Sequence, residues 1–281
     1  MKIAISVEST NDLSTKMLVD NDIKVIAYNI VLGDREFRDG EVSTEDMFKY
    51  VDENGVLPKT NAINEYTYTE YFEELKKNYD AVVHICLSSG ITSSCGNAFR
   101  AAENLENVYA VDSMSLSTGI GLLALYAREL ANAGEDAESI AKKVQERAYK
   151  LQVSFVVERL DYLHKGGRCS SIALLGANLL KIRPRIIVKE GKMLSDKKYR
   201  GHMGSVIAKY CAETLAEFNN PDLDKAFITY TTATTEMVDA AKKALTEAGF
   251  KNIYETKAGG TIASHCGANT LGILYFNDGN K

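Results

Sequence analysis

A run of hydroxyl side chains follows an apolar segment of the chain and could bind an anion. Residues 81–87 are largely apolar and typical of a buried strand, and residues 88–94 then read Ser-Ser-Gly-Ile-Thr-Ser-Ser before a helical pattern begins. In a parallel sheet such a loop lies at the carboxyl end of a strand, where α/β proteins bind their ligands. Hydroxyl groups and the free N–H groups at a helix start would suit a carboxylate or a phosphate. The alternative is that these residues only cap the helix, and the local sequence leaves both roles open.

A second segment brings a histidine together with several glycines. Residues 258–267 read Ala-Gly-Gly-Thr-Ile-Ala-Ser-His-Cys-Gly. Glycines let the backbone approach a ligand closely, and the neutral imidazole of His265 can donate a hydrogen bond to an anion. A single histidine in a loop is more often a structural hydrogen-bonding group, so both roles stay open. A nucleophilic pair of His265 with Cys266 is disfavoured, because adjacent residues of an extended chain point to opposite faces.

A third segment carries a cation beside two glycines. Residues 160–170 end an apolar stretch with the sequence Lys-Gly-Gly-Arg, and we expect a helix over 172–181 to follow. Arg168 could pair with an anion or contact a protein partner. The alternative is a solvated turn in which a glycine closes a short helix.

The motifs that the chain lacks limit the classes of reaction. It has no GxSxG nucleophile elbow, no GxxxxGK[ST] phosphate loop and no GxGxxG after its first strand. The histidines at 84, 164 and 202 have no metal-ligand spacing among themselves, so we predict no metal site. The rival to a binding protein is an acyl ester or thioester hydrolase that uses Thr92 or Cys266 with His265. The missing elbow and the lack of an obvious orienting carboxylate near His265 speak against it.

The elements that must position these segments alternate along the first half of the chain. Short β-rich runs and helices with one apolar stripe follow each other, which is the pattern of a mostly parallel sheet covered by helices on both faces. The strands are expected at residues 3–7, 25–32, 81–87, 108–111 and 153–157.

The second half follows a different pattern. Residues 185–199 predict an antiparallel hairpin that turns at Glu190-Gly191. Helices are expected at 202–218 and 235–248, and strands at 226–230, 253–257 and 272–276. We therefore predict an α/β fold with two domains, an N-terminal parallel sheet flanked by helices over 1–158 and a C-terminal mixed α/β domain over 159–281.

The composition indicates an ordinary globular protein. The 281 residues include 33 Lys+Arg and 38 Asp+Glu, a formal net charge of −5, and we expect neither nucleic acid nor an anionic membrane surface as a partner. Five cysteines without paired spacing favour a reduced, cytoplasmic setting. The first residues are interpreted as a strand and not as a signal peptide. No apolar run approaches the ~20 residues that span a bilayer, so we expect no stable membrane insertion.

Five segments, taken in order, resemble the motifs of the DegV family of lipid-binding proteins. Residues 8–13 are similar to its opening Asp-Ser-Thr-x-Asp-Leu signature, and residues 87–94 to its Ser-Ser-Gly-Leu-Ser-Gly-Thr loop. Residues 111–121 resemble its Asp-Ser-x-x-x-Ser-x-Gly-x-Gly segment. The Lys-Gly-Gly-Arg sequence at 165–168 and the segment 259–265 complete the set. Each motif is weak alone, but five in order along most of the chain are specific.

The resemblance implies two α/β domains that hold one long-chain fatty acid, of about 14 to 18 carbons, with its tail buried in the C-terminal domain. It implies no cofactor and no catalysis by this chain. The chain would instead deliver the acid to a separate ATP-dependent fatty acid kinase subunit, and the kinase would phosphorylate the carboxylate. Arg168 matches the arginine near the mouth of the site, where the kinase would dock. The carboxylate ligands carried over from the family are Thr60, Thr92 and His265, with Asn61 and Ser93 close by. Further lining residues are expected at Ile91, Ser117, Gly119 and Gly267.

The chain departs from the family pattern at several of these positions. Asn61 stands where the family has a serine, Thr92 where it has a serine and Ser93 where it has a glycine. Glu8 is one methylene longer than the usual aspartate. We expect the class of ligand to be preserved and the individual contacts to differ.

Overall fold

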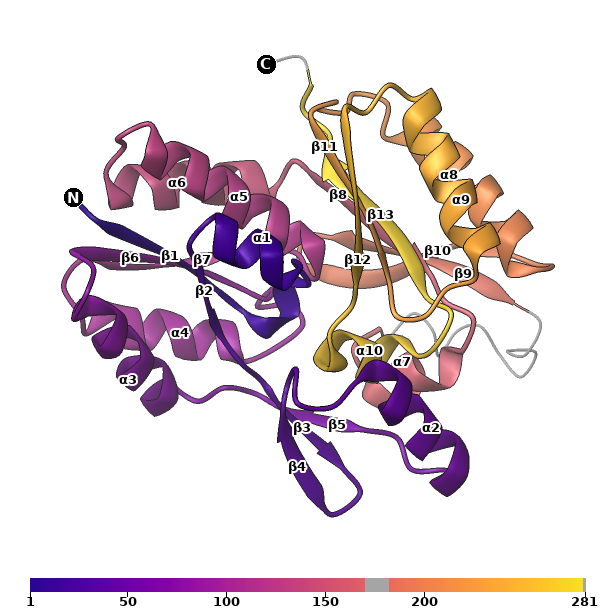
Figure 1. Cartoon of the computed structure of the whole chain (residues 1–281), viewed down its shortest axis with the longest axis horizontal. Coiled ribbons are helices and arrows are strands. Elements are labelled where there is room, and N and C mark those ends of the chain that lie inside the picture. The colour runs from indigo at the N-terminus through magenta and orange to yellow at the C-terminus, as the bar shows by residue number, and fades with distance from the viewer. Residues whose placement is uncertain (170–181, 280–281) are drawn as a thin grey trace.

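Four parallel strands form the first sheet of the computed structural model, which describes residues 1–169 and 182–279 (Figure 1). Their order is β2-β1-β6-β7. Every residue of the two central strands is buried, as expected for a parallel sheet covered on both faces. The strands are β1 (Ile3–Glu8), β2 (Ile23–Ile26), β6 (Ala81–Cys86) and β7 (Val108–Asp112).

Helices cover both faces of this sheet (Figure 1). Helices α3 and α4 pack on one face, and α5 and α6 on the other, while α1 lies beside β2. Asn64 and Asp136 cap the starts of α3 and α6, because each side chain accepts the N–H of the residue three positions later. The helices are α1 (Thr15–Asp20), α3 (Glu65–Lys76), α4 (Ser94–Glu103), α5 (Thr118–Asn132) and α6 (Ala137–Ala148).

The second sheet is mixed, with the order β10-β9-β8-β13-β11-β12. The hairpin expected from the sequence pairs β9 with β10 in antiparallel register, and both turn residues, Glu190 and Gly191, have positive φ. Helices α8 (Met203–Glu217) and α9 (Thr235–Glu247) pack against its outer face (Figure 1). The strands are β8 (Leu151–Val156), β9 (Arg183–Lys189), β10 (Lys192–Tyr199), β11 (Lys225–Tyr230), β12 (Asn252–Lys257) and β13 (Leu271–Phe276).

The two larger sheets share one hydrophobic core. Helix α5 lies between them and contacts β1 and β6 on one side and β8 and β13 on the other (Figure 1). Phe155 of β8 and Leu274 of β13 therefore belong to the same buried cluster as Ile5 of β1. Strand β8 precedes residue 158 in the chain and pairs with β9 and β13. The expected α/β class is confirmed, and none of the described helices has the length and apolarity to cross a membrane.

The single strand expected over residues 25–32 is wrong. The chain forms β2 up to Ile26 and then leaves the first sheet, so that β3 (Asn29–Leu32) joins a small antiparallel sheet with β4 (Arg35–Arg38) and β5 (Lys59–Asn61). The backbone N–H of Tyr28 donates to Ser9 Oγ, at 3.1 Å, and not to a neighbouring strand. Local β propensity could not separate the two strands, because they differ only in the strands with which they pair.

Three helices pack around the small sheet and connect it to the rest of the molecule. Helix α2 (Thr44–Asn54) packs with β3 and with the helices α7 (Leu160–Gly166) and α10 (Gly260–Cys266). The sequence was interpreted as a glycine-rich loop at α10, and that interpretation is wrong. Gly167 in the left-handed conformation ends α7, as the structural alternative for this segment anticipated. The helix expected over 172–181 lies outside the described residues.

Candidate ligand-binding site

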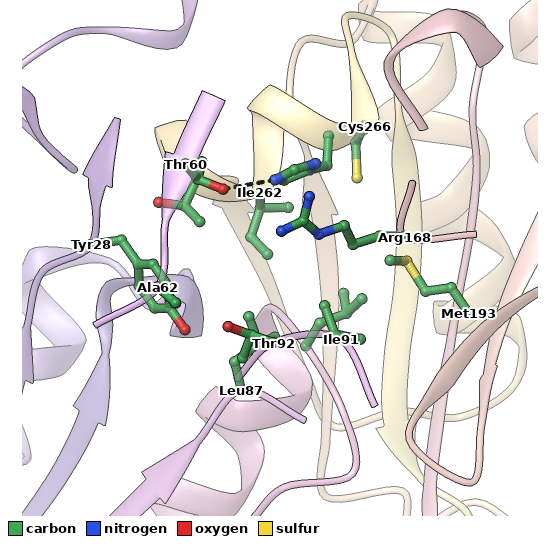
Figure 2. A pocket seen from close by; sticks show the side chains of 13 residues that line it. Tyr28, Thr60, Ala62, Leu87, Ile91, Thr92, Arg168, Met193, Ile262 and Cys266 are labelled. Atoms are coloured by element: carbon green, nitrogen blue, oxygen red, sulfur yellow. Dashed lines mark hydrogen bonds between the residues drawn. The ribbon is translucent and has the colours of Figure 1, made fainter. Parts of the chain in front are cut away.

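A pocket opens where the loop after β6, strand β5 and helix α10 meet (Figure 2). Most of its lining side chains are apolar, and its polar side chains include three threonines, a tyrosine, a histidine and an arginine. Of the residues expected to bind the ligand, Thr60, Thr92, His265 and Ile91 line it, and so does Arg168, which was expected near the mouth where a kinase would dock. The full lining is Tyr28, Thr60, Ala62, Leu87, Ile91, Thr92, Leu116, Arg168, Met193, Thr261, Ile262, His265 and Cys266.

His265 and Thr60 form a hydrogen-bonded pair at the wall of the pocket. The His265 Nε2 atom lies 2.9 Å from Thr60 Oγ1, which joins α10 to β5. Burial, together with the charge of Arg168, lowers the pKa of His265 to about 4, so the imidazole is neutral near pH 7. The Nδ1 atom is buried without a hydrogen-bond partner among the described residues, packed against Gly166. We assign the ring proton to Nε2, because only there does it have an acceptor.

Thr92 both supports the loop and faces the pocket. Its hydroxyl accepts the N–H of Ser94 at 3.2 Å and donates to Ser94 Oγ at 3.1 Å, which stabilises the start of α4. Ser94 Oγ in turn accepts the N–H of Ile63, at 3.0 Å. The N-cap residue, Ser93, makes no side-chain cap hydrogen bond, so Thr92 acts from the turn before α4, and it also lines the pocket. Ser93 and Asn61 are exposed and are not among the lining residues.

Two aspartates hold α10 in place. Asp12 accepts the N–H of Gly259 at 2.8 Å and the hydroxyl of Ser117 at 2.5 Å. Asp39 accepts the N–H groups of Gly260, at 2.8 Å, and Thr261, at 3.2 Å. The first turn of the helix that carries His265 is thus bound by carboxylates from residues more than 200 positions earlier in the chain.

A second, apolar cavity adjoins the pocket. It shares Leu116, Ile262 and Cys266 with the first and extends to the inner face of the six-stranded sheet. Ser117 lines this cavity, although its hydroxyl is committed to Asp12. Together, the pocket and the cavity have hydrogen-bonding groups at one end and an apolar interior. The full lining of the second cavity is Leu116, Ser117, Ser154, Phe155, Thr229, Tyr230, Thr231, Ala258, Ile262, Cys266, Thr270, Gly272 and Leu274.

Comparisons with known proteins cover nearly the whole chain. A sequence model described as an uncharacterised protein of the DegV family matches residues 2–278.

The chain belongs to the DegV family.

The family assignment made from the sequence motifs is therefore confirmed. A DegV domain-containing protein of Clostridium perfringens is 27% identical over 287 residues, which cover 99% of this chain and 98% of the relative. The crystal structure of DegV from Bacillus subtilis, described as a fatty acid binding protein, is 26% identical with a TM-score of 0.86, covering 98% of this chain and 99% of that chain. A DegV family protein from Thermus thermophilus, described for its fatty acid binding, has a TM-score of 0.91 at 23% identity with the same coverage, which shows the shared fold.

Three further residues expected from the DegV motifs have different positions. Arg168 is exposed, donates to the carbonyl oxygen of Gly166 at 2.7 Å, and directs its guanidinium into the pocket (Figure 2). Gly119 and Gly267 are not among the lining residues of either cavity. Gly119 lets α5 approach β8 closely, since a Cβ there would lie 3.0 Å from a methyl group of Val153. Gly267 ends α10 with positive φ.

Two residues at the polar end of the pocket, one lining it and one behind it, were not among the expected site residues. Tyr28 lines the pocket, and Glu8 lies fully buried directly behind it. The Glu8 carboxylate accepts hydrogen bonds from Tyr68 Oη, from Leu87 N at 2.7 Å, from Thr10 Oγ1 at 3.4 Å and from Tyr28 Oη at 3.5 Å. Burial raises the pKa of Glu8 to about 7. The sequence signal that could have identified Glu8 is its position as a carboxylate at the end of the largely apolar strand β1.

One group of described side chains has the donor types of a metal site. Glu8, His84 and Cys86 each offer one ligand atom within 4.8 Å of the others, and all three are buried. Four donors already contact the Glu8 carboxylate, which matches the number of its lone pairs. We therefore describe this group as a hydrogen-bonded part of the core and assign it no metal.

The geometry of a hydrolase is not formed by the described residues. Helical winding brings Cys266 and His265 to the same pocket, so the argument from an extended chain was wrong. Burial, however, raises the pKa of the Cys266 thiol to about 12, which disfavours a thiolate nucleophile. The Thr92 hydroxyl donates to Ser94, and His265 Nδ1 faces Gly166 with no orienting carboxylate.

Proposed function

We propose that this DegV family protein binds one long-chain fatty acid between its two larger sheets and presents the carboxylate to a separate ATP-dependent fatty acid kinase. The carrier performs no chemistry itself. The observation that carries the proposal is the adjacency of a polar pocket, with Thr60, Thr92 and His265, to an apolar cavity that reaches the six-stranded sheet. Such a space is complementary to a molecule with one acid group and one long tail.

The tail supplies the binding free energy in this proposal. Each methylene moved out of water contributes about 0.8 kcal/mol, so a tail of ~16 carbons offers on the order of 12 kcal/mol before the costs of association. The apolar cavity provides the necessary surroundings, because Phe155, Leu274 and Ile262 contribute to its lining. The length of the acid, about 14 to 18 carbons, is part of the proposal.

The polar end fixes the orientation of the acid. A carboxylate that leaves water must receive hydrogen bonds in return. The Thr60 hydroxyl can donate one without bringing a full opposite charge. The Thr92 hydroxyl and the neutral Nε2–H of His265 can donate the others when they exchange their present acceptors, Ser94 Oγ and Thr60 Oγ1, for the acid. We propose these three residues as the carboxylate ligands, with Asn61 and Ser93 as outer neighbours because both are exposed beside them.

The kinase would reach the acid at the exposed side of the pocket. Arg168 is exposed there and offers a cation to an acidic surface of the partner. Formation of the acyl phosphate would then take place on the kinase, with ATP as the phosphoryl donor. A cytoplasmic location is part of the proposal, and five cysteines that are all buried fit it.

Mass spectrometry of the purified, denatured protein tests the proposal. We expect one acid of about 14 to 18 carbons per chain. A Thr60→Val, Thr92→Val double variant, purified in parallel, serves as the control and should release less acid, because both hydroxyl donors are removed. An empty wild-type protein that cleaves acyl esters would refute the carrier and support the hydrolase instead.

A further inference from the structure

Tyr28 occupies an unusual position between two sheets. It lies in the link between β2 and β3 and is only 2% exposed, yet it lines the pocket. Its backbone is fixed, because its N–H donates to Ser9 Oγ at 3.1 Å. Its hydroxyl and that of Thr92 point toward one another (Figure 2). The phenol therefore extends the polar end of the site described above.

The hydrogen bond that the Tyr28 hydroxyl donates within the chain is long, and the hydroxyls of Ser94 and Thr92 interact with the same phenol oxygen. Its acceptor is Glu8 Oε2, at 3.5 Å, whereas the same oxygen accepts the N–H of Leu87 at 2.7 Å. The other Glu8 oxygen accepts the hydroxyl of Tyr68. Glu8 thus keeps its main donors if the phenol turns its proton away, and the phenol gives up little by doing so.

We propose that Tyr28 is a further ligand of the acid, donating its hydroxyl proton to the carboxylate, and that Glu8 is the positioning residue that holds the phenol from behind. The inference rests on the proposed function and adds a residue to it. It differs from the motif-based ligand set, because Tyr28 lies outside every segment that carried the family resemblance.

Glu8 gives this arrangement a charge that depends on pH. An ionised Glu8 and the carboxylate of the acid would face each other across a single phenol, which is unfavourable for two like charges. The other titratable groups around Glu8 are neutral near pH 7: burial raises the pKa values of Tyr28, Tyr68 and Cys86 well above their usual range and lowers that of His84 to about 3. Glu8, with a pKa of about 7, changes charge near neutral pH, and Asp12, which holds the first turn of α10, does so at a higher pH because burial raises its pKa to about 8.

The direction of the pH effect follows from this geometry. Below pH 7 Glu8 is protonated and no longer repels the acid, so binding is strongest there; above pH 7 an ionised Glu8 both repels the acid and attracts the phenol proton. On the opposite side of the pocket, His265 has a pKa of about 4 and stays neutral over this range. Affinity should therefore fall as the pH rises from about 6 to about 8.

The test compares two variants of the full chain, stripped of lipid, with palmitate and with its methyl ester as probes. Tyr28→Phe keeps the ring and removes the donor, so we expect palmitate to bind about 10-fold more weakly or worse, while the ester, which has no carboxylate, binds as before. Glu8→Gln removes the charge that titrates behind the phenol and still accepts from Leu87, so the fall in palmitate affinity between about pH 6 and 8 should be much smaller than in wild type. Thermal unfolding confirms that each variant is folded, and Glu8→Asp, which retains a titrating group, replaces Glu8→Gln if the latter is not.

Each contrary result has a separate meaning. Equal palmitate affinity in wild type and Tyr28→Phe would overturn the proposed ligand role of Tyr28. An equal loss of affinity for palmitate and its ester would also overturn it, because the substitution would then act on the packing of the pocket and not on a bond to the carboxylate. A pH dependence that is as large in Glu8→Gln as in wild type, or that vanishes in Glu8→Asp, would overturn the role of Glu8. A wild-type protein that binds neither probe would instead refute the proposed function itself.

Discussion

Replacing Thr92 with valine removes one hydroxyl from the pocket while keeping the shape of the side chain. In the proposed complex this hydroxyl donates to the carboxylate, and a hydrogen bond to a charged group contributes about 1.5 to 3 kcal/mol. The affinity for palmitate should therefore fall by about 10-fold to 150-fold. The tail keeps its apolar cavity, so binding should weaken without being abolished.

The same substitution also has a calculable effect on stability. Thr92 accepts the N–H of Ser94 at 3.2 Å, and its loss removes a helix-capping interaction worth about 1 kcal/mol. Thermal unfolding of the lipid-free protein should show this modest loss as a lower Tm in a protein that still folds cooperatively.

Equilibrium binding of palmitate to lipid-free protein, measured beside thermal unfolding, separates the two effects. Thr92→Ser is the matched control, because it retains the hydroxyl and loses only a methyl group, so its affinity should stay near that of wild type. The reasoning would be refuted if Thr92→Val bound palmitate as tightly as Thr92→Ser does. The head group would then lie elsewhere than at the start of α4.

Two further predictions concern the exposed side of the pocket and the β9–β10 turn. Arg168→Ala should leave palmitate affinity nearly unchanged and lower acyl-phosphate formation by the partner kinase; a collapse of palmitate binding would instead make Arg168 a head-group ligand. Gly191→Ala should lower the Tm more than Gly134→Ala. Both glycines have positive φ, so the backbone strain is similar. A Cβ at Gly191 would lie 2.5 Å from Ser88 Oγ, whereas nothing lies within 4 Å of a Cβ at Gly134. Equal losses of Tm in the two variants would contradict this close contact.

The sequence predicted correctly those features that depend on residues close together in the chain. The hairpin with its Glu190-Gly191 turn was confirmed, because two residues of positive φ between alternating strands specify a tight turn locally. The strand at β6 and the hydroxyl loop after it were also predictable, since the change from an apolar run to serines and glycine occurs within a few residues. Thr92 and His265 could be singled out by residue type before any geometry was known, and the structure brings both to one pocket.

The sequence missed features that depend on contacts between distant residues. Residues 25–32 were predicted as one strand, whereas the two strands found there join different sheets. Helix α10 was predicted as a loop, because its glycines and hydroxyl residues have low helix propensity. The N–H groups at its start are bound by Asp12 and Asp39 from far along the chain, and the sequence does not show these contacts. Glu8 was noticed only as a lengthened aspartate, and its contact with Tyr28 was not anticipated.

The sequence by itself determined the α/β class, the family and the chemical types of the groups at the site, because these follow from residue identities and short-range periodicity. Only the tertiary structure decided which of those groups share a pocket, that the pocket adjoins an apolar cavity, and that Tyr28 and Glu8 take part. The physical reason is that a binding site depends on distances between side chains from separate elements. Those distances are set by strand pairing and by the packing of α5 between the two larger sheets, which no local pattern encodes.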